Sequence, residues 1–263
     1  MKEVALITIH GMGKVKLKYY EGLEDKLKKS LGDEYWKRIA FENVQYAEIL
    51  QEPQDALWKA MKKSNKLDYT KLREFFLFGF GDAGSLEYSA YHDKVKYIAV
   101  QEKIQETLEK TYKDLGKDKT KPVIIIAQSL GCQVISNYLW DAEKKKYIFK
   151  KGNNDPDKQE FFELKSLTNL ITTGCNIPVC ISGLSNRECL TDPDFEWDNY
   201  YDRDDALGWP LEQLYTTPGK IVTDHEINAG GLLTSWNPFS HRQYWEDKDV
   251  IRPLTKKLLK LLK

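Results

Sequence analysis

Apolar residues alternate between two spacings along the chain, and this alternation predicts strands followed by helices. EVALITIHGMG, near the start, is a β-branched and aliphatic run ending in glycines, which indicates a buried strand and its outgoing loop. Residues 16–32 then place apolar side chains at helical spacing and close at Gly32, which predicts a helix. Strands that alternate with helices predict an α/β fold: a mostly parallel sheet with helices on both faces.

The same alternation continues to the end of the chain. It predicts further strands over 39–49, 121–128, 166–174, 197–202 and 219–228, and further helices over 132–143 and 249–262.

One segment interrupts this alternation. Residues 53–116 form a succession of predicted helices, and only the last is needed before the strand at 121–128. We therefore predict a single domain over 1–263 with a helical insert at 53–93. The apolar cluster at 75–80 has two interpretations, a helical layer buried against the sheet or a cap over a pocket for an apolar substrate.

Composition excludes several classes of function. Forty basic residues balance forty acidic ones, so net charge gives no reason to expect nucleic acid or an anionic membrane as the main partner. The N-terminus lacks a signal-peptide pattern and no run is long enough to span a membrane, so we expect a cytoplasmic protein without a transmembrane segment. The four cysteines, Cys132, Cys175, Cys180 and Cys189, are too irregularly spaced for a disulfide framework or zinc site.

The stretch IIIAQSLGCQV contains a candidate nucleophile. Ser129 follows a predicted strand and precedes a predicted helix, as in a nucleophile elbow, where small residues two before and two after the serine relieve crowding. Gly131 fills the later position and Ala127 the earlier one. Because a serine hydroxyl is a poor nucleophile at neutral pH, it needs a base, an acid that orients the base, and donors for the oxyanion.

A second candidate element is the glycine-containing turn after the first strand. His10-Gly11-Met12-Gly13 leaves a backbone with little side-chain crowding, which can direct an N–H group at a developing oxyanion. The spacing of glycines does not match either common phosphate-binding loop, although nucleotide binding through HGMGK stays an alternative.

These two turns resemble those of the α/β-hydrolase superfamily, in particular its bacterial serine esterases and lipases. The resemblance implies that the backbone N–H groups of Met12 and Leu130 form the oxyanion hole. It also implies a sheet shortened at its N-terminus. The supporting residues it implies are His10, Gly11, Gly13, Gln128 and Gly131. This sequence departs from the pattern at Ala127, where glycine is usual, and at Gln128, where many lipases have histidine.

Superfamily order also implies an acid after a later strand. Asp202, Asp204 and Asp205 compete in NYYDRDDALGWPL. The pattern Asp-x-Leu-Gly-aromatic-x-Leu resembles the Asp-Pro-Val-Ala-Tyr-x-Leu stretch of DDHD-type phospholipases, which selects Asp205 and leaves Asp204 as the runner-up.

The base is expected near the C-terminus. His241 follows the last predicted strand and precedes the terminal helix, whereas His10 and His92 come too early in the chain. His225 lies within a predicted strand, which favours a structural role. The expected catalytic set is therefore Ser129, Asp205 and His241.

Together these features predict a serine hydrolase that cleaves a carboxylic ester through an acyl-enzyme, without a metal or organic cofactor. Trp209, Trp236, Tyr244 and Trp245 favour a small-molecule substrate with an apolar acyl group. A thioesterase or an acyltransferase with the same residues is an alternative, as is a non-catalytic binding module on this fold.

Overall fold

The computed structural model describes residues 1–13, 15–92, 94–185, 187, 190, 193–214, 221–229, 241 and 243–263. The strands are β1 (Val4–Ile9), β2 (Ile39–Val44), β3 (Val123–Gln128), β4 (Leu167–Thr173), β5 (Glu196–Asp202) and β6 (Val222–Ile227). The α-helices are α1 (Glu21–Trp36), α2 (Ala47–Ser64), α3 (Thr70–Tyr91), α4 (Val95–Asp114), α5 (Leu130–Glu143), α6 (Pro156–Phe162), α7 (Ile177–Ile181) and α8 (Lys248–Leu261). Short 3₁₀ turns occupy Tyr147–Phe149 and Tyr244–Glu246.

The six strands form one sheet in the order β2-β1-β3-β4-β5-β6, and every neighbouring pair is parallel. This confirms the predicted α/β fold. All strands therefore end at the same edge. Because the chain runs from β1 outward to β2 and then back to β3 on the other side of β1, the strand order reverses there. Open α/β sheets bind ligands beyond the carboxyl ends of the strands at such a reversal.

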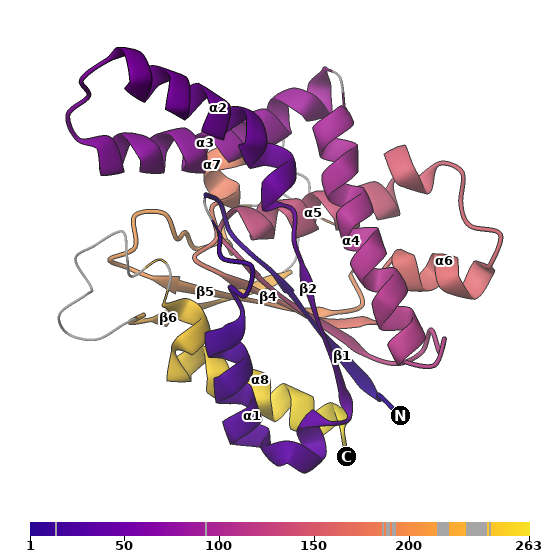
Figure 1. The fold of residues 1–263 in the computed structure, drawn as a ribbon. Helices are drawn as coiled ribbons and strands as arrows, with labels where there is room; N and C mark the ends of the chain where they lie inside the picture. The colour runs from indigo at the N-terminus through magenta and orange to yellow at the C-terminus, as the bar shows by residue number, and fades with distance from the viewer. Residues whose placement is uncertain are drawn as a thin grey trace.

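Helices cover both faces of the sheet, as Figure 1 shows, with α1 and α8 on one face and α4 and α5 on the other. In β1, Ala5, Ile7 and Ile9 pack toward α4 and α5, whereas Val4 and Leu6 pack toward α1 and α8. Successive strand side chains point to opposite faces, so a strand covered on both sides must be apolar throughout. This is the reason for the uninterrupted apolar run in the sequence.

Two predicted boundaries are wrong. The second strand ends at Val44, well before residue 49, because Tyr46 and Leu50 are buried at the four-residue spacing of a helix and belong to the start of α2. The first helix begins only at Glu21. It has a non-helical residue at Gly32, with φ of 77°, and resumes to Trp36.

Helices α2 and α3 form a hairpin that packs on α4, and Figure 1 shows the connection between them projecting away from the sheet. The apolar cluster at 75–80 is divided between interior and surface. Phe78 is buried, whereas Phe76 and Phe80 are 51% and 42% exposed. The segment therefore contributes only part of its apolar side chains to a buried layer, and its role as a cap stays a prediction.

Candidate functional site

Ser129 forms the whole connection between β3 and α5. Its φ of 52° and ψ of −122° lie outside the regions that L-residues normally occupy. Its backbone N–H donates to the Thr173 carbonyl of the neighbouring strand at 3.0 Å, which holds the turn against β4. The Ser129 side chain is 1% exposed, and its Oγ has no hydrogen-bond partner among the described residues.

The loop after β1, residues His10–Gly13, packs directly on this turn. A Cβ atom at Gly131 would lie 2.4 Å from the His10 carbonyl oxygen, and one at Gly11 would lie 2.9 Å from the Ser129 Cβ. Backbone cannot move aside as the end of a side chain can, so glycine at these two positions permits the close approach. Gly11 and Gly131 were named from the sequence, and the structure gives the physical reason for both.

His10 is held within this loop as a neutral ring. Its Nδ1 lies 2.8 Å from the Gly11 carbonyl oxygen, and its Nε2 accepts from the Tyr46 N–H at 3.2 Å. The ring also stacks on Tyr46, with 4.1 Å between ring centroids. Burial lowers the pKa of His10 to about 4, although the hydrogen bond to Gly11 opposes the shift. With both ring nitrogens occupied, His10 is unable to act as a general base.

Asp205 and His241 form a buried pair. Asp205 lies on the loop after β5, and its Oδ2 is 2.7 Å from His241 Nδ1. The carboxylate also accepts from the Leu207 N–H at 3.0 Å and the Tyr244 hydroxyl at 2.9 Å. Burial by itself would raise the pKa of Asp205, but the bond from His241 and these two donors outweigh it and lower the pKa below its usual value.

The other two candidate acids lie apart from this pair. Asp204 is exposed. Asp202 is buried, but it accepts from the backbone N–H groups of Ala229 and Asp204, at 2.7 and 2.9 Å. Gly208 completes the loop, because a Cβ there would lie 2.7 Å from Asp205 Oδ2. The structure thus places Asp205, and neither neighbour, against His241.

His241 and Ser129 each lie beside the end of β4, at Gly174 and Thr173. A Cβ at Gly174 would lie 2.9 Å from His241 Cε1, and the preceding residue, Thr173, holds the Ser129 N–H. The Gln128 side-chain amide donates to the His241 carbonyl, so the glutamine at the unusual position anchors the histidine backbone. His241 Nε2 is buried without a partner in the described part of the chain, and it makes no hydrogen bond to Ser129 Oγ.

The expected donors of the oxyanion hole, the backbone N–H groups of Met12 and Leu130, lie at the turns after β1 and β3. Leu130 is the first residue of α5, and the first N–H groups of a helix have no partner within it. Met12 lies in the His10–Gly13 loop, and its side chain packs on α3, because a Cβ at Gly79 would lie 2.9 Å from Met12 Sδ.

A residue that the sequence analysis missed fixes this loop. Asp82 of α3 is 1% exposed and accepts from the Gly13 N–H at 2.8 Å and from the Gln54 side chain at 2.8 Å. Gln51 of α2 donates to the Gly13 carbonyl. The signal in the sequence was a single carboxylate within the apolar segment FLFGFGDAG. The α2–α3 hairpin therefore holds the loop that carries Met12.

The four aromatic residues that favoured an apolar substrate in the sequence differ in where they lie. Tyr244 and Trp245 are buried supports: the first donates to Asp205, and the second donates through Nε1 to Thr173 Oγ1 at 3.1 Å. Because these two side chains are buried supports, they give no evidence about a substrate, and the expected apolar acyl group stays a prediction. Trp209 is 44% exposed, and Trp236 lies outside the described residues.

A second histidine–carboxylate pair lies on the strands themselves. His225 of β6 places Nε2 2.7 Å from Asp198 Oδ1 of β5, and Lys257 of α8 lies 3.0 Å from the other oxygen of the same carboxylate. The position of His225 within a strand agrees with the structural role expected for it.

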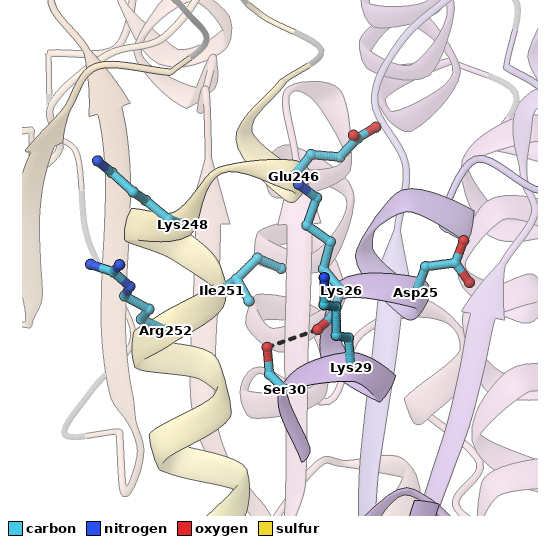
Figure 2. A pocket seen from close by; sticks show the side chains of 8 residues that line it. All are labelled: Asp25, Lys26, Lys29, Ser30, Glu246, Lys248, Ile251 and Arg252. Atoms are coloured by element: carbon cyan, nitrogen blue, oxygen red, sulfur yellow. Dashed lines mark hydrogen bonds between the residues drawn. The ribbon is translucent and has the colours of Figure 1, made fainter. Parts of the chain in front are cut away.

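A groove of about 350 Å³ between α1 and the start of α8 lies away from these residues. Figure 2 shows Lys248 and Arg252 pointing to one side of it and Asp25 to the other. Neither Ser129, Asp205 nor His241 lines it, so it has no part in the candidate site.

The described ranges contain no cluster of three or more histidine, cysteine, aspartate or glutamate side chains arranged for a metal ion. Cys132, Cys175 and Cys180 are free thiols, and Cys189 falls in a part of the chain that is not described. No helix of the described part has both the length and the apolar character of a membrane span.

Comparisons with known proteins find likeness in structure and none in sequence. No protein-family model matches the chain, and no curated protein matches its sequence. A solved structure of a cutinase-like protein from Cryptococcus sp. is similar over 99% of this chain and 95% of that chain, with a TM-score of 0.40 and 10% sequence identity. A likeness this distant carries no argument about substrate or residue roles.

Proposed function

We propose that this protein is a serine hydrolase that cleaves a carboxylic ester through an acyl-enzyme on Ser129. The observation that carries the proposal is the convergence of a strained serine and a buried Asp205–His241 pair at the carboxyl edge of the sheet, beside the reversal of strand order. Strained residues and buried, unpartnered polar atoms gather at functional sites, because a purely structural role gives no compensation for their cost.

The proton path follows from the hydrogen bonds. Asp205 accepts from His241 Nδ1, which leaves Nε2 as the acceptor for the Ser129 hydroxyl proton. Ser129 Oγ and His241 Nε2 are both buried without a hydrogen-bond partner in the described residues, and we expect a bond between them to form when substrate binds. Such bonds are often long in the free enzyme and tighten when substrate binds. Asp205 then stabilises the imidazolium that forms.

The oxyanion is bound by the backbone N–H groups of Met12 and Leu130. Leu130 contributes the N-terminal end of α5, where the helix dipole favours negative charge. Met12 is positioned by the neutral His10 ring on one side of its loop and by Asp82 on the other. Fixed donors stabilise the charge of the transition state without reorganising during the reaction.

The substrate is proposed to be a small molecule with an apolar acyl group, since Met12 lies in the loop that packs on the Ser129 turn and the half-exposed Trp209 follows Asp205 on its loop. Thioesters, and acyl transfer to an alcohol, use the same chemistry and stay alternatives. The free thiols fit the expected cytoplasmic location.

Labelling with a fluorophosphonate probe tests the proposal. Wild-type protein is expected to be labelled, Ser129→Ala and His241→Ala are expected to lose labelling, and Ser30→Ala, at an exposed serine of α1, is expected to keep it. Circular dichroism verifies that each variant is folded. Absence of labelling in folded wild type, or labelling that persists in Ser129→Ala, overturns the proposal. A panel of acyl esters and thioesters then separates the alternatives.

A further inference from the structure

The tip of the α2–α3 hairpin combines exposed apolar side chains with a local excess of positive charge. We call the exposed side chains of residues 57–80 the hairpin tip. Its apolar members are Leu57, Met61, Tyr69, Leu72, Phe76 and Phe80, each between 42% and 79% exposed. Its basic members, all exposed, are Lys59, Lys62, Lys63, Lys66, Lys71 and Arg73. Large apolar side chains gathered at an exposed surface mark a site of interaction with a partner or a membrane.

The apolar side chains follow helical spacing. Leu72, Phe76 and Phe80 recur every four residues and form one stripe along α3, and the Phe76 and Phe80 rings stack with 5.6 Å between centroids. Leu57 and Met61 have the same spacing on α2. These stripes are additional to the buried face of the hairpin, which Trp58 and Phe78 supply.

The positive charge is concentrated around the connection between α2 and α3. Between Lys59 and Arg73 there are six basic residues and one acidic residue, Asp68, which leaves five excess positive charges. Because the whole chain has a net charge of zero, the rest of the molecule carries five excess negative charges. The overall neutrality of the chain therefore does not exclude a local excess of positive charge that attracts an anionic partner.

Exposed apolar stripes beside an excess of positive charge favour one class of partner. A second copy of the chain would cover the apolar stripes but would bring another set of lysines against these ones, which is repulsive. A nucleic acid would satisfy the lysines but not the stripes. An anionic lipid surface satisfies both, because its headgroups attract Lys and Arg and its acyl boundary accepts aromatic and aliphatic side chains. Figure 1 shows the hairpin connection projecting from the body of the protein, where a flat surface can reach it.

We propose that the hairpin tip docks on anionic lipid membranes. The inference does not depend on the hydrolase proposal, since binding is measured without turnover.

The test is flotation of the full chain with lipid vesicles, carried out on a Ser129→Ala background so that the proposed nucleophile is absent. Vesicles of phosphatidylcholine alone are compared with vesicles of phosphatidylcholine and phosphatidylglycerol at about 70:30. We expect half-maximal binding to the mixed vesicles at a lipid concentration at least about tenfold lower, and we expect raising NaCl from about 0.05 M to about 0.5 M to remove most of this preference.

Two double variants separate the contribution of the basic side chains to membrane binding from that of the apolar side chains. Lys59→Glu with Lys63→Glu is expected to abolish the preference for anionic vesicles, and Phe76→Ser with Phe80→Ser is expected to weaken binding by about tenfold or more. The matched control is Lys26→Glu with Lys29→Glu, which changes charge equally on exposed positions of α1 and is expected to leave binding unchanged.

Several outcomes overturn the proposal. These are equal binding to both vesicle types, binding that is insensitive to salt, or equal loss in the α1 control. Sedimentation of the unmodified chain as a dimer that Phe76→Ser with Phe80→Ser dissociates would also overturn it, because a second copy would then occupy the stripes.

Discussion

The carboxyl edge of the sheet and the hairpin tip follow opposite rules of packing. At the edge, Ser129, Asp205 and His241 are 1%, 5% and 7% exposed, and a Cβ at Gly131 or Gly174 would overlap its neighbours. In the hairpin tip, about half of Phe76 is exposed, and further along α3, beyond the tip, a Cβ at Gly84 would meet nothing within 4 Å. Close backbone contacts thus restrict which residues fit at the carboxyl edge, whereas the exposed side chains of the hairpin tip can change in shape without a clash. The properties of the tip depend on its apolar and basic composition.

The largest difference is expected in turnover. Asp205→Asn places an amide where a carboxylate accepts from His241 Nδ1, so the ring adopts the wrong tautomer, and ester hydrolysis should fall by about 10³- to 10⁴-fold. Asp204→Asn, one residue away and exposed, should change it less than about twofold. Steady-state kinetics on a short-chain ester makes the measurement. Equal losses in both variants would remove Asp205 from its proposed role.

Substituting glycine by alanine should change the free energy of unfolding in opposite directions at the carboxyl edge of the sheet and on the exposed side of α3. Gly131→Ala forces a Cβ to 2.4 Å from the His10 carbonyl oxygen and should lower the free energy of unfolding by about 3 kcal/mol or more. Gly84→Ala, in the middle of α3, should raise it by about 0.5 to 1 kcal/mol through helix propensity. Urea denaturation of both proteins gives the values. A neutral Gly131→Ala would mean that the loop after β1 yields easily.

The buried His10 should make stability depend on pH. Its pKa of about 4 in the folded protein lies below the usual value of about 6.5 in the unfolded chain, so the unfolded state binds the proton first. Its contribution is complete above about pH 6.5 and is lost as the pH falls toward 4, amounting to about 2 kcal/mol between about pH 7.5 and about pH 5.

Urea denaturation at several pH values, with His92→Gln as the exposed control, measures this dependence. In His92→Gln, the free energy of unfolding should depend on pH as it does in the wild type. In His10→Asn, this dependence should be weaker. Asp82 and Asp141, whose pKa values burial raises, act in the opposite sense and are present in every variant, so the difference isolates His10. An NMR titration showing that His10 protonates near pH 6.5 in the folded protein would contradict the prediction.

A further effect is expected at the contact between α3 and the loop after β1. Asp82→Ala leaves the Gly13 N–H and the Gln54 amide without their acceptor, and should lower the free energy of unfolding by about 1 to 3 kcal/mol and slow ester hydrolysis. Asp82→Asn should cost less, because Gln54 Oε1 has no partner in the described structure and can accept from the new amide after the Gln54 side chain turns over. If both variants keep full activity, α3 does not position the loop.

Local sequence determined the strands, the helices that follow them, and the turns at Ser129 and His10. The reason is that a strand buried on both faces must be continuously apolar, and that a sharp turn between strand and helix demands small residues beside it. These are constraints between near neighbours, and they stay visible in the order of residues. The ends of elements were harder to predict where a residue fits both the two-residue spacing of a strand and the spacing of a helix. Tyr46 is such a residue, because it is buried after β2 and lies at the N-cap of α2.

Only the tertiary structure decided which polar groups meet. Asp202, Asp204 and Asp205 are alike in the sequence, and the selection of Asp205 by resemblance became a physical contact only through His241, which lies 36 residues away. Asp82 reaches the Gly13 N–H across 69 residues, and Phe76 differs from Phe78 only in which side of α3 meets the protein. Such outcomes depend on how whole elements pack, because burial and hydrogen-bond distance are properties of the assembled chain and not of any segment of it.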